Sequence, residues 1–286
     1  MSAPTKPGSG RRTPAHLRGL VAEQAVPQPI PRRVVSTEAA AEAAPAHGVQ
    51  APHDEALLAR LIKATPARVG TGRTGTRYRT ESYLVLRADH AIAKDAVYAE
   101  ISQETASRLA CIEVVSRCPN REHYLLVPND GRRLSDESRE KLAREGSRGA
   151  DVQIILADGL AAPALGLNGP PLLPALTEAL QRKGCSVGKT ILARMARVGL
   201  QDDIGVLLGS KATLICLGER PGLGTGDSMS IYIAVAPRLD QDNAEKNCIS
   251  NIRPQGLTPE KAAEQAADLV ARGIAAGRGG LALAHA

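Results

Sequence analysis

Residues 212–228 read ATLICLGERPGLGTGDS, and the change of character inside this stretch guides the interpretation of the fold. Residues 212–217 are an uninterrupted apolar and β-branched run with the length of a buried strand. The run ends at residues 218–222, where a proline prevents further strand pairing and two glycines permit tight turns. Ligands bind at the carboxyl ends of strands in open α/β sheets, so Glu219 and Arg220 stand where a binding site is expected. A pair that merely faces solvent is the plainer alternative.

Helices and strands alternate on both sides of this strand. We predict strands at 152–157, 190–196, 212–217 and 230–235, and helices at 135–146, 172–182, 202–208 and 258–274. The last helix has Thr258 as N-cap and Pro259 at its first position, a combination that favours a helix start. This alternation predicts a Rossmann-like three-layer α/β domain with a mainly parallel sheet over residues 131–286.

The N-terminal part divides into two segments of different composition. Residues 1–54 contain 8 of the 19 prolines, which predicts a flexible tail. A short amphipathic targeting helix at 14–26 is the alternative there. Residues 55–130 are predicted to form a small, mainly helical domain, with a helix from Glu55, a basic loop and a second helix capped by Thr80. A hairpin-like connection is expected at 111–128.

Composition excludes several classes of protein. The chain has 286 residues, of which 43% are hydrophobic, so it can bury a sizeable core; with no Trp and no Phe that core must be aliphatic. The five cysteines are scattered without a Cys-x-x-Cys, which argues against a disulfide framework and a zinc site. No apolar run approaches a membrane span or the core of a signal peptide, so we expect a cytoplasmic protein without membrane association.

Positive charge gathers between residues 60 and 94, which we call the basic region. It contains Glu81 and Asp89 against eight basic residues: Arg60, Lys63, Arg68, Arg73, Arg77, Arg79, Arg87 and Lys94. The resulting balance of +6 equals the net charge of the whole protein. Such a surface suits an anionic partner, either nucleic acid, phosphate or an acidic protein. Because few aromatic residues are available for base stacking, a protein partner is favoured.

Two glycine motifs resemble nucleotide-binding loops but stand in the wrong context. Residues 70–75 satisfy Gly-x-Gly-x-x-Gly, yet no buried strand precedes them. Residues 183–190 resemble a P-loop, but Lys183 occupies the first glycine position and the segment leads from a helix into a strand. A stand-alone nucleotide- or nucleic-acid-binding protein therefore stays the alternative function, supported by the pI of about 9.2.

Several motifs together resemble the small (light) subunit of ethanolamine ammonia-lyase over roughly residues 60–275. They are Gly-Glu-Arg-Pro-Gly-Leu at 218–223, Asp227-Ser228, Asn-Cys-Ile-Ser-Asn-Ile-Arg-Pro at 247–254, Ala-Arg-Val-Gly at 67–70, Arg-Tyr-Arg-Thr at 77–80, Arg-Ala-Asp-His-Ala at 87–91 and Ala-Asp-Gly-Leu at 157–160. The resemblance implies a subunit of an adenosylcobalamin-dependent radical enzyme that converts ethanolamine to acetaldehyde and ammonia. It also implies a large subunit that holds the substrate, so no catalytic residue is assigned to this chain.

By matching motifs, the resemblance places cobalamin contacts on Val198, Glu219 and Cys248. A carboxylate suits the amides of the corrin, and a valine suits its apolar edge. The plainer alternatives are an ordinary strand terminus for Val198 and a small buried hydrophobe for Cys248. A structural paralogue that has lost the cofactor is a further alternative.

The chain lacks the Asp-x-His-x-x-Gly pattern of enzymes that replace cobalamin's own base with a histidine, so we expect base-on cobalamin. No metal ligand is predicted in this chain. The resemblance implies a hetero-oligomer with several copies of each subunit. It leaves open whether that complex is free in the cytosol or packaged in a bacterial microcompartment, and the weak helical pattern of the tail favours free cytosol.

Overall fold

A computed structural model describes residues 48–65 and 67–285. The chain divides into two units, 1–44 and 45–286, and the described residues all lie in the second. The tail predicted at 1–54 therefore falls largely outside the described residues, and the alternative targeting helix at 14–26 falls wholly outside them.

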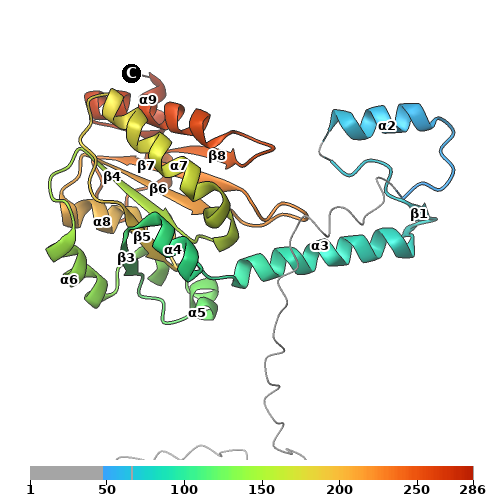
Figure 1. Cartoon of the computed structure of the whole chain (residues 1–286), viewed down its shortest axis with the longest axis horizontal. Helices are drawn as coiled ribbons and strands as arrows, with labels where there is room; N and C mark the ends of the chain where they lie inside the picture. The colour runs from blue at the N-terminus through green and yellow to red at the C-terminus, as the bar shows by residue number, and fades with distance from the viewer. Residues whose placement is uncertain (1–47, 66, 286) are drawn as a thin grey trace, which may run out of the picture. The chain divides into compact units, whose positions relative to one another are not determined.

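A six-stranded sheet forms the core of the α/β domain (Figure 1). Its strands are β3 (Ile112–Val115), β4 (Val152–Ala157), β5 (Ile191–Arg194), β6 (Ala212–Gly218), β7 (Met229–Val235) and β8 (Lys246–Ile252), in the spatial order β3-β5-β4-β6-β7-β8. The first four strands in this order are parallel, and β7 runs antiparallel to both β6 and β8. The predicted mainly parallel sheet is confirmed.

Helices cover both faces of the sheet. Ile154 and Leu156 of β4 pack into the core beneath α7 (Ala162–Arg182) and α9 (Pro259–Ala276). Ile155 and Ala157, which alternate with them, pack into the core beneath α6 (Asp136–Glu145) and α8 (Leu200–Leu208). A strand that is buried on both faces reads as a continuous apolar run, as β4 and β6 do. The domain is therefore a Rossmann-like three-layer α/β fold.

Two helix starts follow the predicted capping. The Thr258 hydroxyl accepts a hydrogen bond from the Lys261 backbone N–H, and Pro259 is the first residue of α9. The Ser135 hydroxyl likewise accepts from the Ser138 N–H at the start of α6. At the second helix of the basic region the cap prediction is wrong, because Arg79 occupies the N-cap and Thr80 is the first helical residue.

The predicted helix at 172–182 begins ten residues earlier, at Ala162. Its three internal prolines, Pro170, Pro171 and Pro174, each remove a backbone donor and would normally interrupt a helix. The apolar face of α7, with Leu165, Leu172 and Leu176 fully buried, offsets this cost through tertiary packing. The prolines therefore lie within the helix and do not mark its start.

The hairpin-like connection predicted at 111–128 is half right. Its first part forms β3, but its second part is a helix, α5 (Arg121–Leu126). The Asn120 side chain accepts a hydrogen bond from the His123 N–H, so a helix cap outweighs the β-like pattern that follows it. Sequence patterns also gave no strand at β8, whose exposed polar residues conceal its pairing with β7.

The region before the sheet contains α2 (Glu55–Ala64), a two-stranded ladder of β1 (Arg73–Thr74) and β2 (Arg77–Tyr78), and the helices α3 (Thr80–Tyr98) and α4 (Gln103–Leu109). The two predicted helices of the basic region are thus present. The domain boundary predicted at residue 130 falls where α5 leads into η2 (Asp130–Arg132). Among the described residues, no helix is both long and apolar enough to cross a membrane.

Candidate cofactor-binding site

Polar segments follow three neighbouring strands of the sheet. Asp158 follows β4, Arg197 and Val198 follow β5, and Glu219 follows β6, and these strands are mutually parallel neighbours. Their carboxyl ends therefore lie at the same edge of the sheet. The contacts at this edge divide it into two parts with different properties.

At β4 and β5 the edge is filled by protein, and we call this part the closed rim. One oxygen of Asp158, Oδ2, accepts hydrogen bonds from Nη1 of Arg121 at 3.0 Å and from the Met195 N–H at 2.7 Å. The other, Oδ1, accepts from the Ala196 N–H at 3.1 Å. Arg121 also donates to the carbonyls of Val97 and Gly159. Both side chains of this ion pair are buried, and the carboxylate of Asp158 is fully engaged with protein donors.

Tyr124 completes the closed rim. Its side chain is fully buried, and its hydroxyl lies within hydrogen-bond distance of the carbonyls of Gly159 (2.9 Å) and Ala196 (3.1 Å). The guanidinium groups of Arg121 and Arg197 lie 4.6 and 4.2 Å from the centre of its ring. Burial raises the pKa of Tyr124 well above its usual value, so the hydroxyl stays a neutral donor. Sequence reasoning missed this residue because α5 was predicted as a strand.

Beyond β6 the edge is open, and we call Glu219, Ser230, Tyr232 and Cys248 the open face. The Glu219 backbone N–H donates to the Ser228 carbonyl, which joins the start of the β6–β7 loop to its end. Its carboxylate oxygen Oε1 accepts from the Ser230 hydroxyl at 2.5 Å and from the Asn251 N–H at 3.0 Å. Within the described residues, Oε2 has no hydrogen-bond partner. Glu219 is thus fixed by β7 and β8 through one oxygen and offers the other.

Cys248 lies opposite Tyr232 in the register of β7 and β8. The hydroxyls of Tyr232 and Ser230 lie close enough to its thiol to lower its pKa, and Ser230 also donates to Glu219, so the predicted pair Glu219 and Cys248 meets around Ser230. Burial is the main cause that raises the pKa of Tyr232 to about 12, with the Cys248 and Glu219 charges adding to it. Burial also raises the pKa of Cys248, and the hydrogen bonds from Tyr232 and Ser230 oppose the rise. The phenol and the thiol of the open face therefore stay neutral at neutral pH.

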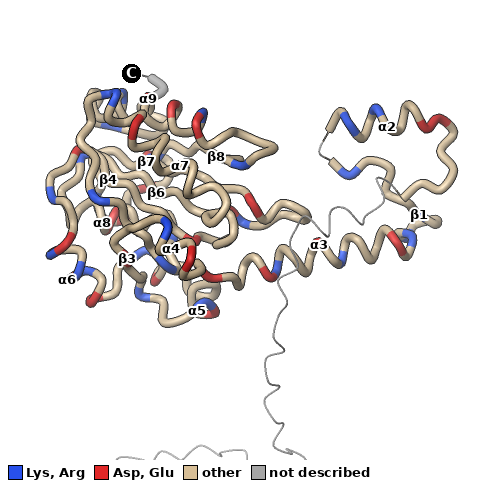
Figure 2. Tube along the Cα trace, in the orientation of Figure 1, with Lys and Arg blue, Asp and Glu red and all other residues tan. Residues whose placement is uncertain are grey.

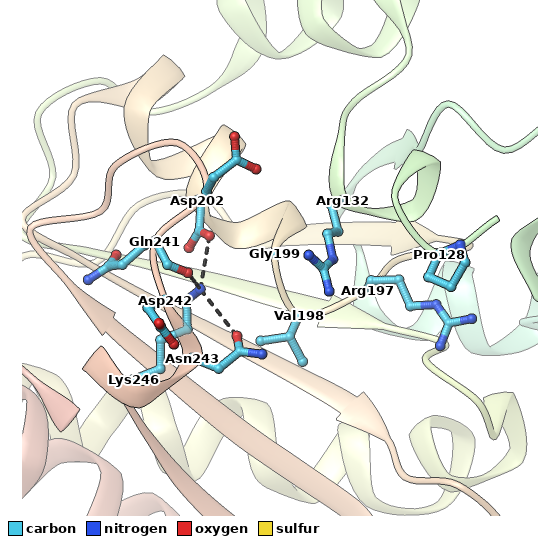
Figure 3. A pocket seen from close by; sticks show the side chains of 11 residues that line it. Pro128, Arg132, Arg197, Val198, Gly199, Asp202, Gln241, Asp242, Asn243 and Lys246 are labelled. Carbon is cyan, nitrogen blue, oxygen red and sulfur yellow. Dashed lines mark hydrogen bonds and ion pairs between the residues drawn. The ribbon is translucent and has the colours of Figure 1, made fainter. Parts of the chain in front are cut away.

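Val198 lies in the loop between β5 and α8. It follows β5, is half-buried, and packs against the core beneath α6 and α8. Tyr232 of the open face packs against the same core cluster as Val198. It lines a pocket together with Arg132, Arg197 and Lys246 (Figure 3). The polar residues of β7, Ser230 and Tyr232, could have been found from the sequence because they alternate with buried apolar residues on that strand.

This arrangement can bind and orient a ligand, and offers little for proton transfer. A fixed carboxylate accepts hydrogen bonds, a phenol and a thiol stay neutral, and a valine supplies apolar contact. Among residues 48–65 and 67–285, no group of three or more His, Cys, Asp or Glu side chains could hold a metal ion.

The model of the family "Ethanolamine ammonia-lyase light chain (EutC)" matches residues 55–284. The match spans α2 to the last described turn of the chain and includes the closed rim and the open face. It supports an enzyme subunit, in a carbon–nitrogen lyase of ethanolamine catabolism, and gives no support to a stand-alone nucleic-acid-binding protein. The description as a light chain implies a larger partner subunit. This chain belongs to the ethanolamine ammonia-lyase light chain family.

Proposed function

We propose that this chain forms one side of an adenosylcobalamin site whose other side is the large subunit, with Val198, Glu219 and Cys248 in contact with the cofactor. The observation that carries the proposal is that only one oxygen of the Glu219 carboxylate has hydrogen-bond partners among the described residues. Two donors from different strands hold Oε1, so Oε2 is preorganised to accept a hydrogen bond from a ligand.

The residues of the open face fit a corrinoid. The rim of a corrin carries primary amides, whose N–H groups suit a carboxylate oxygen such as Oε2 of Glu219. Cys248 is exposed and neutral, and Val198 is half-buried, so both can pack against the apolar edge of a large ring. Cys248 makes the open face accessible, whereas α7 and α9 pack on the opposite face of β7.

When bound, adenosylcobalamin supplies the radical chemistry that converts ethanolamine to acetaldehyde and ammonia. The role of this chain is to bind and orient the cofactor through Glu219, Cys248 and Val198. The substrate site belongs to the large subunit in this proposal, because the open face has no group poised for acid or base chemistry.

We propose that the cofactor stays base-on. The chain lacks an Asp-x-His-x-x-Gly motif, and none of the described histidines, His53, His90, His123 and His285, belongs to the open face. Electron paramagnetic resonance of the complex, with the histidines of this chain labelled with ¹⁵N, should show unchanged cobalt–nitrogen coupling. A changed coupling would identify a histidine ligand and contradict base-on binding.

The basic region is proposed as part of the large-subunit interface. Figure 2 shows lysine and arginine along α2, β1 and α3. The ten-residue α2 has no buried residue, and Leu57 and Leu61 are 46% and 47% exposed. A helix this short is marginal alone in water, so a partner that covers its apolar side would stabilise it. The assembly is proposed to contain several copies of each subunit and to be free in the cytoplasm, with a microcompartment as the alternative.

Charge reversal tests the interface. The double change Arg77→Glu and Arg79→Glu should reduce co-purification with the large subunit, while Arg148→Glu, an exposed position at the far end of α6, should not. Intact assembly of the double variant would contradict this role for the basic region.

Reconstitution tests the function as a whole. The purified chain is mixed with the large subunit from the same source, adenosylcobalamin and ethanolamine, and acetaldehyde release is followed. Activity should require both chains and the cofactor. Full activity of the large subunit alone would contradict the composite site.

Glu219 tests the site within the assembled complex. Glu219→Gln keeps the shape but removes the charge, and it should weaken cobalamin binding about tenfold, as expected for a hydrogen bond to a charged group. Glu140→Gln, on the exposed side of α6, is the matched control. An unchanged dissociation constant for the Glu219 variant would remove Glu219 from the site.

A further inference from the structure

A pocket of about 330 Å³ lies beside Val198. It is enclosed by η2, by the turn from β5 into α8, and by the β7–β8 connection, which brings Gln241 and Lys246 to it (Figure 3). Its volume is within the range of small-ligand pockets but far below that of a whole cobalamin. It can therefore hold only an arm of such a molecule.

Arg132 and Arg197 both line this pocket. The Arg197 side chain lies against Gly131, and the Arg132 side chain lies against Gly199. A Cβ added at Gly131 would come within 2.7 Å of the Arg197 side chain, and one at Gly199 within 3.1 Å of the Arg132 side chain. The Arg197 N–H also donates to the Gly131 carbonyl at 2.8 Å. The two glycines thus let the arginine side chains approach the backbone closely, and a larger residue at either position would push the arginine away.

Both guanidinium groups have donors to spare. Arg197 is held over the Tyr124 ring and donates through Nη2 to the Tyr124 carbonyl, yet its Nε is buried without a hydrogen-bond partner. Arg132 is exposed, and its guanidinium has no ion pair or hydrogen bond to any described residue. An unsatisfied buried donor costs free energy, so a ligand that accepts hydrogen bonds would be stabilised here.

Acceptors are left over in the same pocket. Lys246 is buried and donates to Oδ2 of Asp202 at 2.9 Å and to the Gln241 carbonyl at 2.7 Å. The remaining oxygen of Asp202, Oδ1, and Oε1 of Gln241 are buried without partners. A ligand that carries hydroxyl donors beside an anionic group could donate to these two oxygens and accept hydrogen bonds from the two arginines.

We infer that this pocket holds the nucleotide tail of cobalamin, with Arg132 and Arg197 on its phosphodiester. The inference rests on the proposed function, because Val198 joins the pocket to the proposed corrin contacts. The phosphodiester is the anionic group of cobalamin, and its ribose supplies hydroxyl donors. Arginine presents several donors in a plane that matches phosphate oxygens.

The acidic residues at the pocket have other partners. Asp202 pairs with Lys246, Asp240 pairs with Arg133 at 2.6 Å, and the Asp242 side chain caps η3 (Asn243–Glu245) through the Ala244 N–H. Arg132 and Arg197 therefore keep their charge for a ligand. A neutral amide arm of the corrin would leave that charge unpaired, which favours the phosphodiester.

The test compares two corrinoids on the assembled complex. Cobinamide has the corrin and its amides but lacks the nucleotide tail, so it isolates the corrin contacts. Dissociation constants for cyanocobalamin and dicyanocobinamide are measured by spectral titration for the wild type, Arg132→Gln, Arg197→Gln and the control Arg144→Gln on exposed α6. Thermal unfolding and co-purification establish that each variant is folded and assembled.

Arg132→Gln should weaken cyanocobalamin binding about tenfold and leave cobinamide binding unchanged. Arg197→Gln should act in the same direction. Equal losses for both corrinoids, or no loss for either, would overturn the inference and leave the corrin contacts standing. Glu219→Gln should weaken both corrinoids alike. Failure of the wild-type complex to bind either corrinoid would instead refute the proposed function itself.

Discussion

The closed rim and the open face occupy the same edge of one sheet, but their carboxylates differ in how many of their oxygens are hydrogen-bonded. At the closed rim, Asp158 makes three hydrogen bonds and pairs with the buried Arg121. At the open face, Glu219 has two donors on one oxygen and none from the described residues on the other. A carboxylate whose oxygens are all engaged stabilises the protein, whereas a carboxylate fixed at one oxygen is ready for a ligand.

The difference also shows where a Rossmann-like sheet can place a site. The crevice at the ends of parallel strands is the usual location, but here α5 fills its β4 and β5 part with Arg121 and Tyr124. The candidate surface shifts toward the antiparallel strands β7 and β8, where Glu219 keeps one oxygen without a partner among the described residues and Cys248 is exposed. Fold alone would have placed the site one or two strands away.

The largest expected effect is on the stability of the closed rim. Asp158→Ala leaves the Arg121 charge buried without its partner and removes the acceptor of two backbone N–H groups. The free energy of unfolding should fall by about 3–5 kcal/mol in denaturant titrations. Arg238→Ala, which breaks the exposed pair with Glu245, should leave the unfolding midpoint unchanged. Comparable midpoints for the two variants would erase the distinction between buried and exposed pairs.

A smaller loss is expected from Tyr124→Phe, which removes the hydroxyl that reaches two carbonyls at the closed rim. Unfolding should become easier by about 1–2 kcal/mol, while the affinity of the assembled complex for cobalamin stays the same. Tyr83→Phe on exposed α3 provides the control. If cobalamin binding fell with Tyr124→Phe, the closed rim would belong to the binding site.

Ser230→Ala should lower cobalamin affinity and leave stability nearly unchanged. The Glu219 carboxylate loses one of its two donors and becomes freer to rotate, so cobalamin affinity should fall about threefold to fivefold. The unfolding free energy should change by less than about 1 kcal/mol, because the freed carboxylate can be hydrated. Ser250→Ala, at an exposed position of β8, is the matched control. A large stability loss without a change in affinity would assign Ser230 a structural role.

The smallest effect concerns cysteine reactivity. Cys248 is exposed, whereas Cys118 near the closed rim is buried. Iodoacetamide labelling followed by peptide mass spectrometry should therefore modify Cys248 before Cys118. Since the pKa of Cys248 is raised above its usual 9.0, thiolate is scarce at pH 8 and the rate should climb as pH rises past 9. Earlier modification of Cys118, or a rate independent of pH, would contradict this assignment.

The sequence predicted best where one physical signal dominated. Residues 212–217 are apolar throughout because β6 is buried on both faces, and Thr258 with Pro259 marks a helix start in any context. It predicted worst where signals competed. The apolar run 124–127 resembles a strand, but the Asn120 cap and the burial of Tyr124 make it a helix. The prolines of α7 are outweighed by a buried face that local patterns do not reveal.

In the candidate site, too, local sequence patterns predicted some residues and missed those whose roles depend on long-range contacts. A charged residue after a buried strand placed Glu219 correctly at the rim, and no local pattern could add that Ser230 and Asn251 hold it. Those contacts depend on the pairing of β7 with β6 and β8, which involves residues far apart in sequence. Arg121 and Tyr124 were missed because their roles at the closed rim follow from a helix that the sequence did not predict.

The strand order also has a consequence for the sequence of events during synthesis. β3 pairs with β5, and Ile112 meets Ile191. The edge strand must therefore wait for the ribosome to deliver β4, α7 and β5 before its pairing is possible. β6, β7 and β8 instead join consecutive neighbours through shorter loops, so they can assemble quickly once they emerge. The part of the chain that carries Glu219 and Cys248 is thus made after the parallel strands and pairs rapidly, whereas the edge strand β3 waits longest for its partner.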